Sequence, residues 1–112
     1  MALDTTALVS AMSTAGQGLG TAVWNNIQTF ALPELQKIAT QIIAIETGML
    51  QNPPQYTQDG AKALFNMQIN ASVGVIVAMT ALTLLAVQAA INQMIAAVKT
   101  MVNTALKFTL IA

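Results

Sequence analysis

The side chains that could carry out chemistry are few, and they are spread along the chain. The hydroxyls of Ser10, Ser13 and Ser72 are candidate nucleophiles, but the sequence contains no histidine to act as their base. Glu34 and Glu46 are separated by three helical turns and are expected beside solvated positions, which argues against a paired-carboxylate site. Cysteine is also absent, so the usual zinc and iron–sulfur ligands are missing. We therefore predict no catalytic residue, no metal site and no cofactor, and expect a protein that is not an enzyme.

The composition limits the partners that such a chain can have. Its 112 residues suit a single domain over 1–112, with 55% hydrophobic and only 7% charged residues. Four lysines balance four acidic residues and arginine is absent, so no basic cluster could neutralise a phosphate backbone. So few charges would do little to keep a small monomer soluble. We expect a homo-oligomer, with no specific nucleic-acid binding and no small-molecule substrate.

The longest apolar stretch lies in the second half of the chain. Residues 63–98 contain no charge, and Val73–Ile91 is interrupted only by two threonines and one glutamine. A helix over residues 71–91 would cover about 30 Å, which is the thickness of the hydrocarbon core of a bilayer. Two interpretations are open: contact with membrane lipid at some stage, or a helix buried on all sides by copies of itself.

The first half of the chain divides into a helical arm and a helix. Residues 5–30 show helical periodicity, but the glycines of the GQGLG run at 16–20 weaken it and mark a hinge or a close approach of backbones. This indicates a kinked arm. Proline lacks an N–H, so Pro33 suits the first turn of a new helix, which we place over 34–51.

The rest of the chain predicts a loop and one long helix. Residues 52–58 form a Pro-rich loop whose tip contains Pro53, Pro54 and Tyr56. No proline follows, so the sequence predicts a continuous helix over 59–110, about 75 Å long. The expected fold is all-α: a helical hairpin with a kinked N-terminal helical arm and one very long C-terminal helix. Such a rod favours assembly into a helical or ring-like oligomer.

Two faces of the predicted long helix have different characters. Pairs of small residues spaced four apart would let helices pack closely, and these form the predicted helix-packing interface. They are Gly74, Ala78, Ala86 and Ala90. A polar stripe is expected to face a lumen, a polar seam or solvent. It consists of Gln88, Asn92, Lys99, Asn103 and Lys107. We expect leucine at Gly74 or Ala86 to prevent assembly, and Asn103→Ala to be tolerated.

Part of the chain resembles a known family. Asn52-Pro53-Pro54 resembles the turn of the needle and inner-rod subunits of type III secretion systems, and Leu64–Gln68 resembles the stretch after it. The resemblance covers about residues 49–95. It implies a short helical hairpin whose copies stack in a right-handed array, with C-terminal helices lining an export channel. In composition the chain is also similar to conjugative pilins, filamentous virus coat proteins and holin-like pore formers.

The sequence thus favours a self-assembling structural subunit of a filament, rod or tube that contacts or crosses a membrane, such as a secretion or pilus-like conduit. The alternative is a small integral membrane protein with a helical hairpin, either a holin-like pore former or a viral coat protein. Lys99 and Lys107 would then keep the C-terminus cytoplasmic. We expect a membrane-associated or cell-surface assembly. A cleavable Sec signal is not expected, since Asp4 stands where a basic region would begin.

Overall fold

Helices account for all the regular secondary structure that the computed structural model shows in the described residues, 3–112. In chain order they are α1 (Thr5–Gln17), α2 (Thr21–Met49), α3 (Gln58–Met79), α4 (Leu84–Ala96) and α5 (Lys99–Leu106). The all-α class predicted from the sequence is therefore confirmed.

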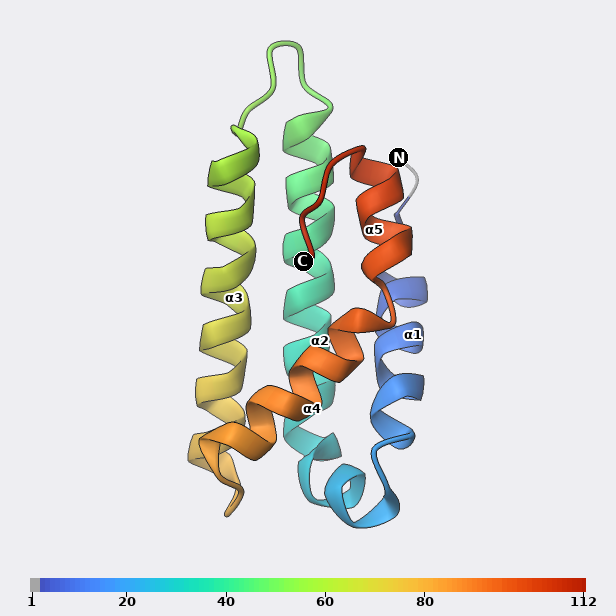
Figure 1. The fold of residues 1–112 in the computed structure, drawn as a ribbon, viewed down its shortest axis with the longest axis vertical. Helices are drawn as coiled ribbons and strands as arrows, with labels where there is room; N and C mark the ends of the chain where they lie inside the picture. The colour runs from blue at the N-terminus through green and yellow to red at the C-terminus, as the bar shows by residue number, and fades with distance from the viewer. Residues whose placement is uncertain (1–2) are drawn as a thin grey trace.

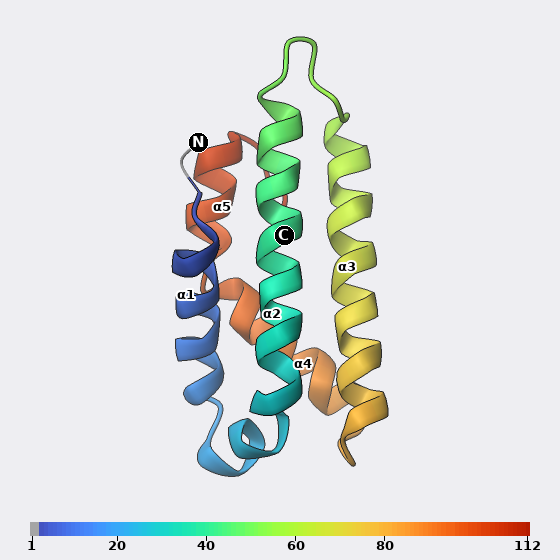
Figure 2. The same cartoon turned by 180° about the vertical axis from the view of Figure 1, so that it is seen from behind.

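The helices are arranged around α2. In Figures 1 and 2, α2 and α3 run antiparallel and are joined at one end by the loop over residues 50–57. Helix α1 packs on α2, and α4 crosses the front of the bundle obliquely to contact both α3 and α1 (Figure 1). Helix α5 packs against α2 and α4. The resulting bundle measures 46 × 22 × 20 Å.

Two glycines shape the connection between α1 and α2. A Cβ atom at Gly16 would collide with the ring of Trp24 and lie 2.9 Å from Sδ of Met94. Gly16 therefore allows α1, α2 and α4 to approach closely. Gly20 has a φ of 109°, which L-amino acids rarely adopt, and it forms the turn before α2. The GQGLG run thus provides both a close approach and a turn.

Helix α2 passes through Pro33 without a break, so the predicted helix start at residue 34 is wrong. Proline inside a helix costs about 3 kcal/mol relative to alanine. Against this cost, Ile27, Leu35, Ile38 and Ile42 are completely buried along one face of the same helix. Burying each such side chain contributes about 1.5–3 kcal/mol. Pro33 itself is exposed, so its ring faces solvent. The burial of the four apolar side chains therefore outweighs the hydrogen bond that the proline removes.

The continuous helix predicted over residues 59–110 is also wrong. The structure divides this region into α3, α4 and α5, with breaks at Thr80–Thr83 and Ala97–Val98. The axes of α4 and α5 differ by 56°. The longest dimension of the bundle is consequently 46 Å, instead of the predicted rod of about 75 Å.

Two threonines produce the first break. The hydroxyl of Thr80 donates to the carbonyl oxygen of Ile76 at 2.8 Å and accepts from the backbone N–H of Leu82 at 3.3 Å. The hydroxyl of Thr83 accepts from the backbone N–H of Ala86 at 3.2 Å and caps α4. These bonds satisfy backbone groups that the break would otherwise leave unpaired.

The chain folds back after α5. Lys107, with a φ of 63°, ends the helix in the left-handed conformation, and residues 108–112 form what we call the C-terminal segment. The side-chain amide oxygen of Asn103 accepts from the N–H groups of Leu110 at 2.9 Å and Ile111 at 3.0 Å. Its amide nitrogen donates to the carbonyl oxygen of Ile111 at 2.9 Å. Leu110 and Ile111 are thereby held in the buried core.

Candidate functional site

Of the serines considered for catalysis, Ser10 and Ser13 lie together on α1, whereas Ser72 lies on α3. Ser13 donates a hydrogen bond to the carbonyl oxygen of Ser10 at 3.2 Å. Ser72 is buried and accepts a hydrogen bond from the amide nitrogen of Gln68 at 3.1 Å. Over residues 3–112, no three acidic residues gather where they could hold a metal ion.

Glu34 and Glu46 are buried, which corrects the expectation that they lie beside solvated positions. Their exposed fractions are 3% and 1%. Glu34 accepts a hydrogen bond from Nζ of Lys37 at 2.9 Å, and Glu46 accepts one from the backbone N–H of Leu3 at 3.4 Å. Because both residues lie on the straight part of α2, they are about 18 Å apart and form no pair.

An exposed apolar surface covers the outside of α3 and the beginning of α4. We call it the α3–α4 apolar surface. It comprises Met67, Ala71, Gly74, Val75, Ala78, Met79, Leu84 and Leu85. Leu85 is 78% exposed and Met67 is 66% exposed. The whole surface lies within the chargeless stretch of residues 63–98.

The surface has a helical order. Met67, Ala71, Gly74 and Ala78 are spaced by four, three and four residues, so they lie on one side of α3. The buried residues of α3, such as Ile76, lie on the opposite side. A Cβ atom at Gly74 would have no neighbour within 4 Å. Helix α3 therefore has no charge on this side: small and apolar side chains lie there beside the exposed amides of Asn66 and Asn70.

The predicted helix-packing residues divide between this surface and the core. Gly74 and Ala78 belong to the surface, and Ala86 is exposed near it on α4. Ala90 is 4% exposed and is part of the buried core. Its small side chain therefore serves packing within the chain.

The predicted polar stripe is not one continuous face, because α4 and α5 meet at an angle of 56°. Four of its five residues are exposed. These are Gln88, Asn92, Lys99 and Lys107. Asn103 is half-buried and makes the three hydrogen bonds that hold the C-terminal segment. These hydrogen bonds argue against the expectation that Asn103→Ala is tolerated.

The residues of the predicted loop tip have two environments. Pro53 and Pro54 are exposed, whereas Tyr56 is half-buried. The Tyr56 ring lies so close to Gly48 that a Cβ atom there would collide with it. Tyr56 therefore rests against the end of α2.

Helix α3 is long and apolar enough to cross a membrane, with a mean hydropathy of 1.2 over a stretch that is 22% buried. Helices α4 and α5 meet the same criteria only as a bent pair. The apolar stretch Val73–Ile91, predicted as one helix, is divided by the break at Thr80–Thr83.

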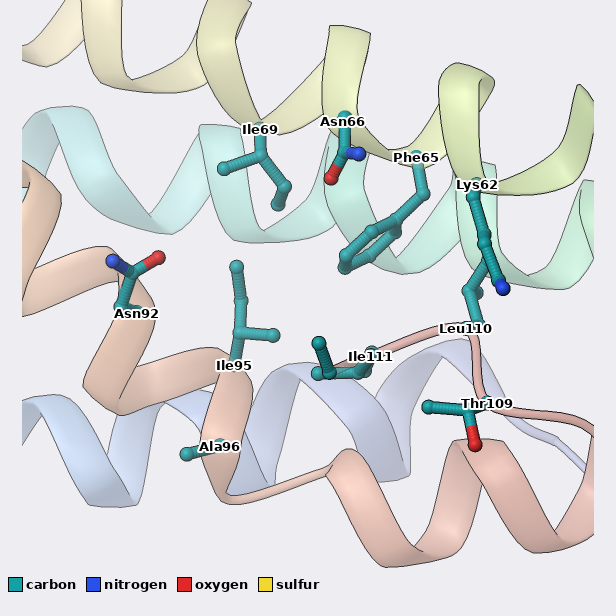
Figure 3. A pocket seen from close by; sticks show the side chains of 11 residues that line it. Lys62, Phe65, Asn66, Ile69, Asn92, Ile95, Ala96, Thr109, Leu110 and Ile111 are labelled. Atoms are coloured by element: carbon teal, nitrogen blue, oxygen red, sulfur yellow. The ribbon is translucent and has the colours of Figure 1, made fainter. Parts of the chain in front are cut away.

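A cleft of about 560 Å³ opens between α3, α4 and the C-terminal segment, and we call it the side cleft. In Figure 3, Phe65 and Ile69 of α3 point toward Ile95 of α4 across the cleft. Asn92 lies near one end of this apolar row and Lys62 lies at the other end, beside Leu110. Sequence reasoning missed the cleft because its three walls come from separate parts of the chain, brought together by the breaks around α4 and the turn held by Asn103.

Neither protein-family models nor curated proteins match this sequence, and no solved structure matches its fold. The α3–α4 apolar surface and the side cleft are therefore interpreted from their own chemistry.

Proposed function

We propose that this protein is a structural subunit that assembles with copies of itself through the α3–α4 apolar surface, in an assembly that contacts a membrane. The observation that carries the proposal is the outer face of α3. Between residues 63 and 79 it exposes methionine, alanine, glycine and valine with only the amides of Asn66 and Asn70, where the exposed face of a helix in water normally carries charged residues as well.

The energetics favour covering this surface. Apolar area left in water costs roughly 25 cal/mol for each Å², and contiguous exposed apolar patches typically mark interaction sites. The small side chains of Ala71, Gly74 and Ala78 would let a second helix approach α3 closely over about two turns. A second copy of α3 or the start of α4 offers the same chemistry, so like subunits are suitable partners.

We propose a filament, rod or tube as the form of the assembly. The antiparallel arrangement of α2 and α3 around the loop at residues 50–57 supports this. So does the resemblance of residues 49–95 to the needle and inner-rod subunits. Open-ended growth follows if α3 of one copy packs on the start of α4 of the next, because a contact between two different patches leaves both patches available at the ends.

The second candidate function is that of a small integral membrane protein in which lipid covers α3. The length and hydropathy of α3 favour it. Helix α2 carries Glu34, Lys37 and Glu46, so it is a poor second span of a membrane hairpin. We therefore prefer assembly, with lipid as an additional contact.

The Gly74→Leu variant tests the assembly. A leucine at this open position leaves the fold intact, because no atom lies where its Cβ would be placed. It would nevertheless hold a neighbouring helix away. Ala44→Leu adds bulk at an exposed position of α2 and serves as the matched control. We expect sedimentation without detergent to show large species for the native chain and the control, and monomers for Gly74→Leu. A native chain that sediments as a stable 11.7 kDa monomer contradicts the proposal.

Carbonate extraction separates the two candidate functions. An assembly held by protein contacts persists without lipid and is released from membranes at high pH. A chain with α3 across the bilayer stays in the membrane pellet. Retention of both the native chain and Gly74→Leu in the pellet would favour the integral membrane protein.

A further inference from the structure

The side cleft has the features of a small-molecule binding site. Its volume of about 560 Å³ lies within the range of roughly 300–1,000 Å³ found for ligand pockets. Its floor is apolar, and Figure 3 shows the side chains of Phe65, Ile69 and Ile95 converging on the open space from two helices. An apolar trough of this kind suits a hydrocarbon chain.

The charged side chain that lines the cleft is basic. Lys62 is the charged side chain among the residues that line it, and over the described residues 3–112 its ammonium makes no ion pair within 4 Å. The other polar side chains along the edge, those of Asn66, Asn92 and Thr109, are neutral. No carboxylate side chain lines the described cleft. An anionic group is therefore favoured at the Lys62 end, and no side chain of the lining would pair with a cationic headgroup.

The third wall of the cleft is held in place before any ligand binds. Thr109, Leu110 and Ile111 form this wall, and Asn103 fixes it through three hydrogen bonds of 2.9–3.0 Å. Leu110 and Ile111 are each 5% exposed, so packing in the core also holds this wall in place. A wall that is already ordered lowers the entropic cost of binding.

We propose that the side cleft binds a single-chain amphiphile with an anionic headgroup, such as a fatty acid or a lysophospholipid. The headgroup lies at Lys62, and the chain extends over Phe65 and between Ile69 and Ile95 toward Asn92. No residue of the α3–α4 apolar surface lines the cleft, so this inference is independent of the proposed assembly.

Titration with myristate, kept below the concentration at which it forms micelles, tests the proposal on the full chain. Tetradecanol has the same chain without the charge, and tetradecyltrimethylammonium carries the opposite charge. We expect myristate to bind most tightly and the ammonium compound most weakly. Lysophosphatidylglycerol distinguishes a phosphate from a carboxylate headgroup, and binding of either anion supports the proposal. Equal binding of the anionic and cationic probes, or binding of neither anion, overturns it.

Two pairs of variants locate the site. Lys62→Met should weaken myristate binding by about threefold to tenfold and leave tetradecanol binding unchanged, because it removes one partly exposed charge contact. Lys99→Met removes an exposed lysine outside the cleft and should change neither. Ala96→Phe should abolish binding of both probes by filling the cleft, whereas Ala97→Phe, one residue outside it, should not.

Sedimentation of the same variants separates this proposal from the assembly. Ala96→Phe should assemble like the native chain, and Gly74→Leu should bind myristate like the native chain. Loss of assembly in Ala96→Phe with unchanged myristate binding would identify the cleft as a contact between copies, and would overturn the amphiphile site. Loss of myristate binding in Ala97→Phe as well as in Ala96→Phe would also overturn it.

Discussion

Helices α2 and α3 lie side by side and bury similar apolar faces, but their outer faces differ. The outer face of α2 exposes Gln36, Lys37 and Thr40, as is usual for a helix that meets water. The outer face of α3 exposes Met67 and Gly74 within a stretch that has no charge. Because the inner faces are alike, the difference reports what the outer faces meet. The outer face of α2 suits water, whereas the outer face of α3 is the one that the proposed assembly would cover.

The same two regions differ in continuity. Helix α2 continues through Pro33, a residue with very low helix propensity, whereas α3 ends at Met79 although the sequence stays apolar beyond Thr80. A continuous buried face keeps α2 helical on both sides of the proline. At Thr80 and Thr83, side-chain hydroxyls replace the lost helical hydrogen bonds, so the chain can turn and α4 can cross the bundle. Packing and capping decide these boundaries more than propensity does.

The largest expected effect comes from truncating the inner face of α2. Ile42 is completely buried, so Ile42→Ala should lower the free energy of unfolding by about 2–5 kcal/mol. Met67→Ala on the outer face of α3 should change it by less than about 0.5 kcal/mol, because Met67 is 66% exposed. Urea unfolding in the Gly74→Leu background measures both without a contribution from association. Similar losses for the two variants would mean that the outer face of α3 is covered within the monomer.

The next effect concerns the C-terminal segment, which contributes Leu110 and Ile111 to the same core as the inner face of α2. Asn103→Ala should lower the free energy of unfolding by about 1–3 kcal/mol, since it leaves backbone groups of this segment without their partner. Asn70→Ala removes an exposed amide from α3 and is the control.

Hydrogen exchange gives a local measurement of the same variant. The amides of Leu110 and Ile111 should exchange faster in Asn103→Ala than in the native chain. Unchanged exchange at these amides would show that packing alone holds the segment in place.

A smaller effect tests the break that separates α3 from α4. Thr83→Ala should lower the free energy of unfolding by about 1 kcal/mol, the usual contribution of an N-cap hydroxyl. Thr104→Ala, at an exposed position within α5, should be neutral or slightly stabilising because alanine is the better helix former. If both variants behave alike in thermal unfolding, the cap at Thr83 does not stabilise the break.

Local sequence features predict part of this structure. The helical spacing of apolar residues predicts the all-α class, and the prolines after residue 51 predict the loop that follows α2. The break at Thr80–Thr83 was not predicted, because a threonine can serve equally well inside a helix or at its cap. Whether the helix continues or ends at these threonines depends on the packing of α4 against α1 and α3. The spacing around Gly74 likewise predicts a small-residue face, but only the fold shows which side of α3 it occupies.

The side chains that depend on distant contacts were beyond sequence reasoning. The buried carboxylate of Glu46 accepts from Leu3, which lies forty-three positions away. Asn103 was expected on a polar stripe facing a lumen, a polar seam or solvent, and its role depends on the turn at Lys107 that brings Leu110 back to it. The side cleft combines residues from α3, α4 and the C-terminal segment, so no local sequence pattern predicts it.

The variant with the smallest expected effect on stability is the most direct test of the comparison between α2 and α3. It gives α3 a charged outer face like that of α2. The double variant Met67→Glu, Ala71→Lys places opposite charges four residues apart on the exposed face of α3. Such a pair changes the free energy of unfolding by about 0.5 kcal/mol or less. Burying these charges against a second subunit would be strongly unfavourable, so the variant should remain monomeric in sedimentation at every concentration tested.

The matched control, Gln36→Glu, Thr40→Lys, adds the same pair to the outer face of α2 and should assemble like the native chain. Assembly of both variants would place the contact elsewhere on the molecule. Loss of assembly in both would mean that added charge, rather than the outer face of α3, controls association.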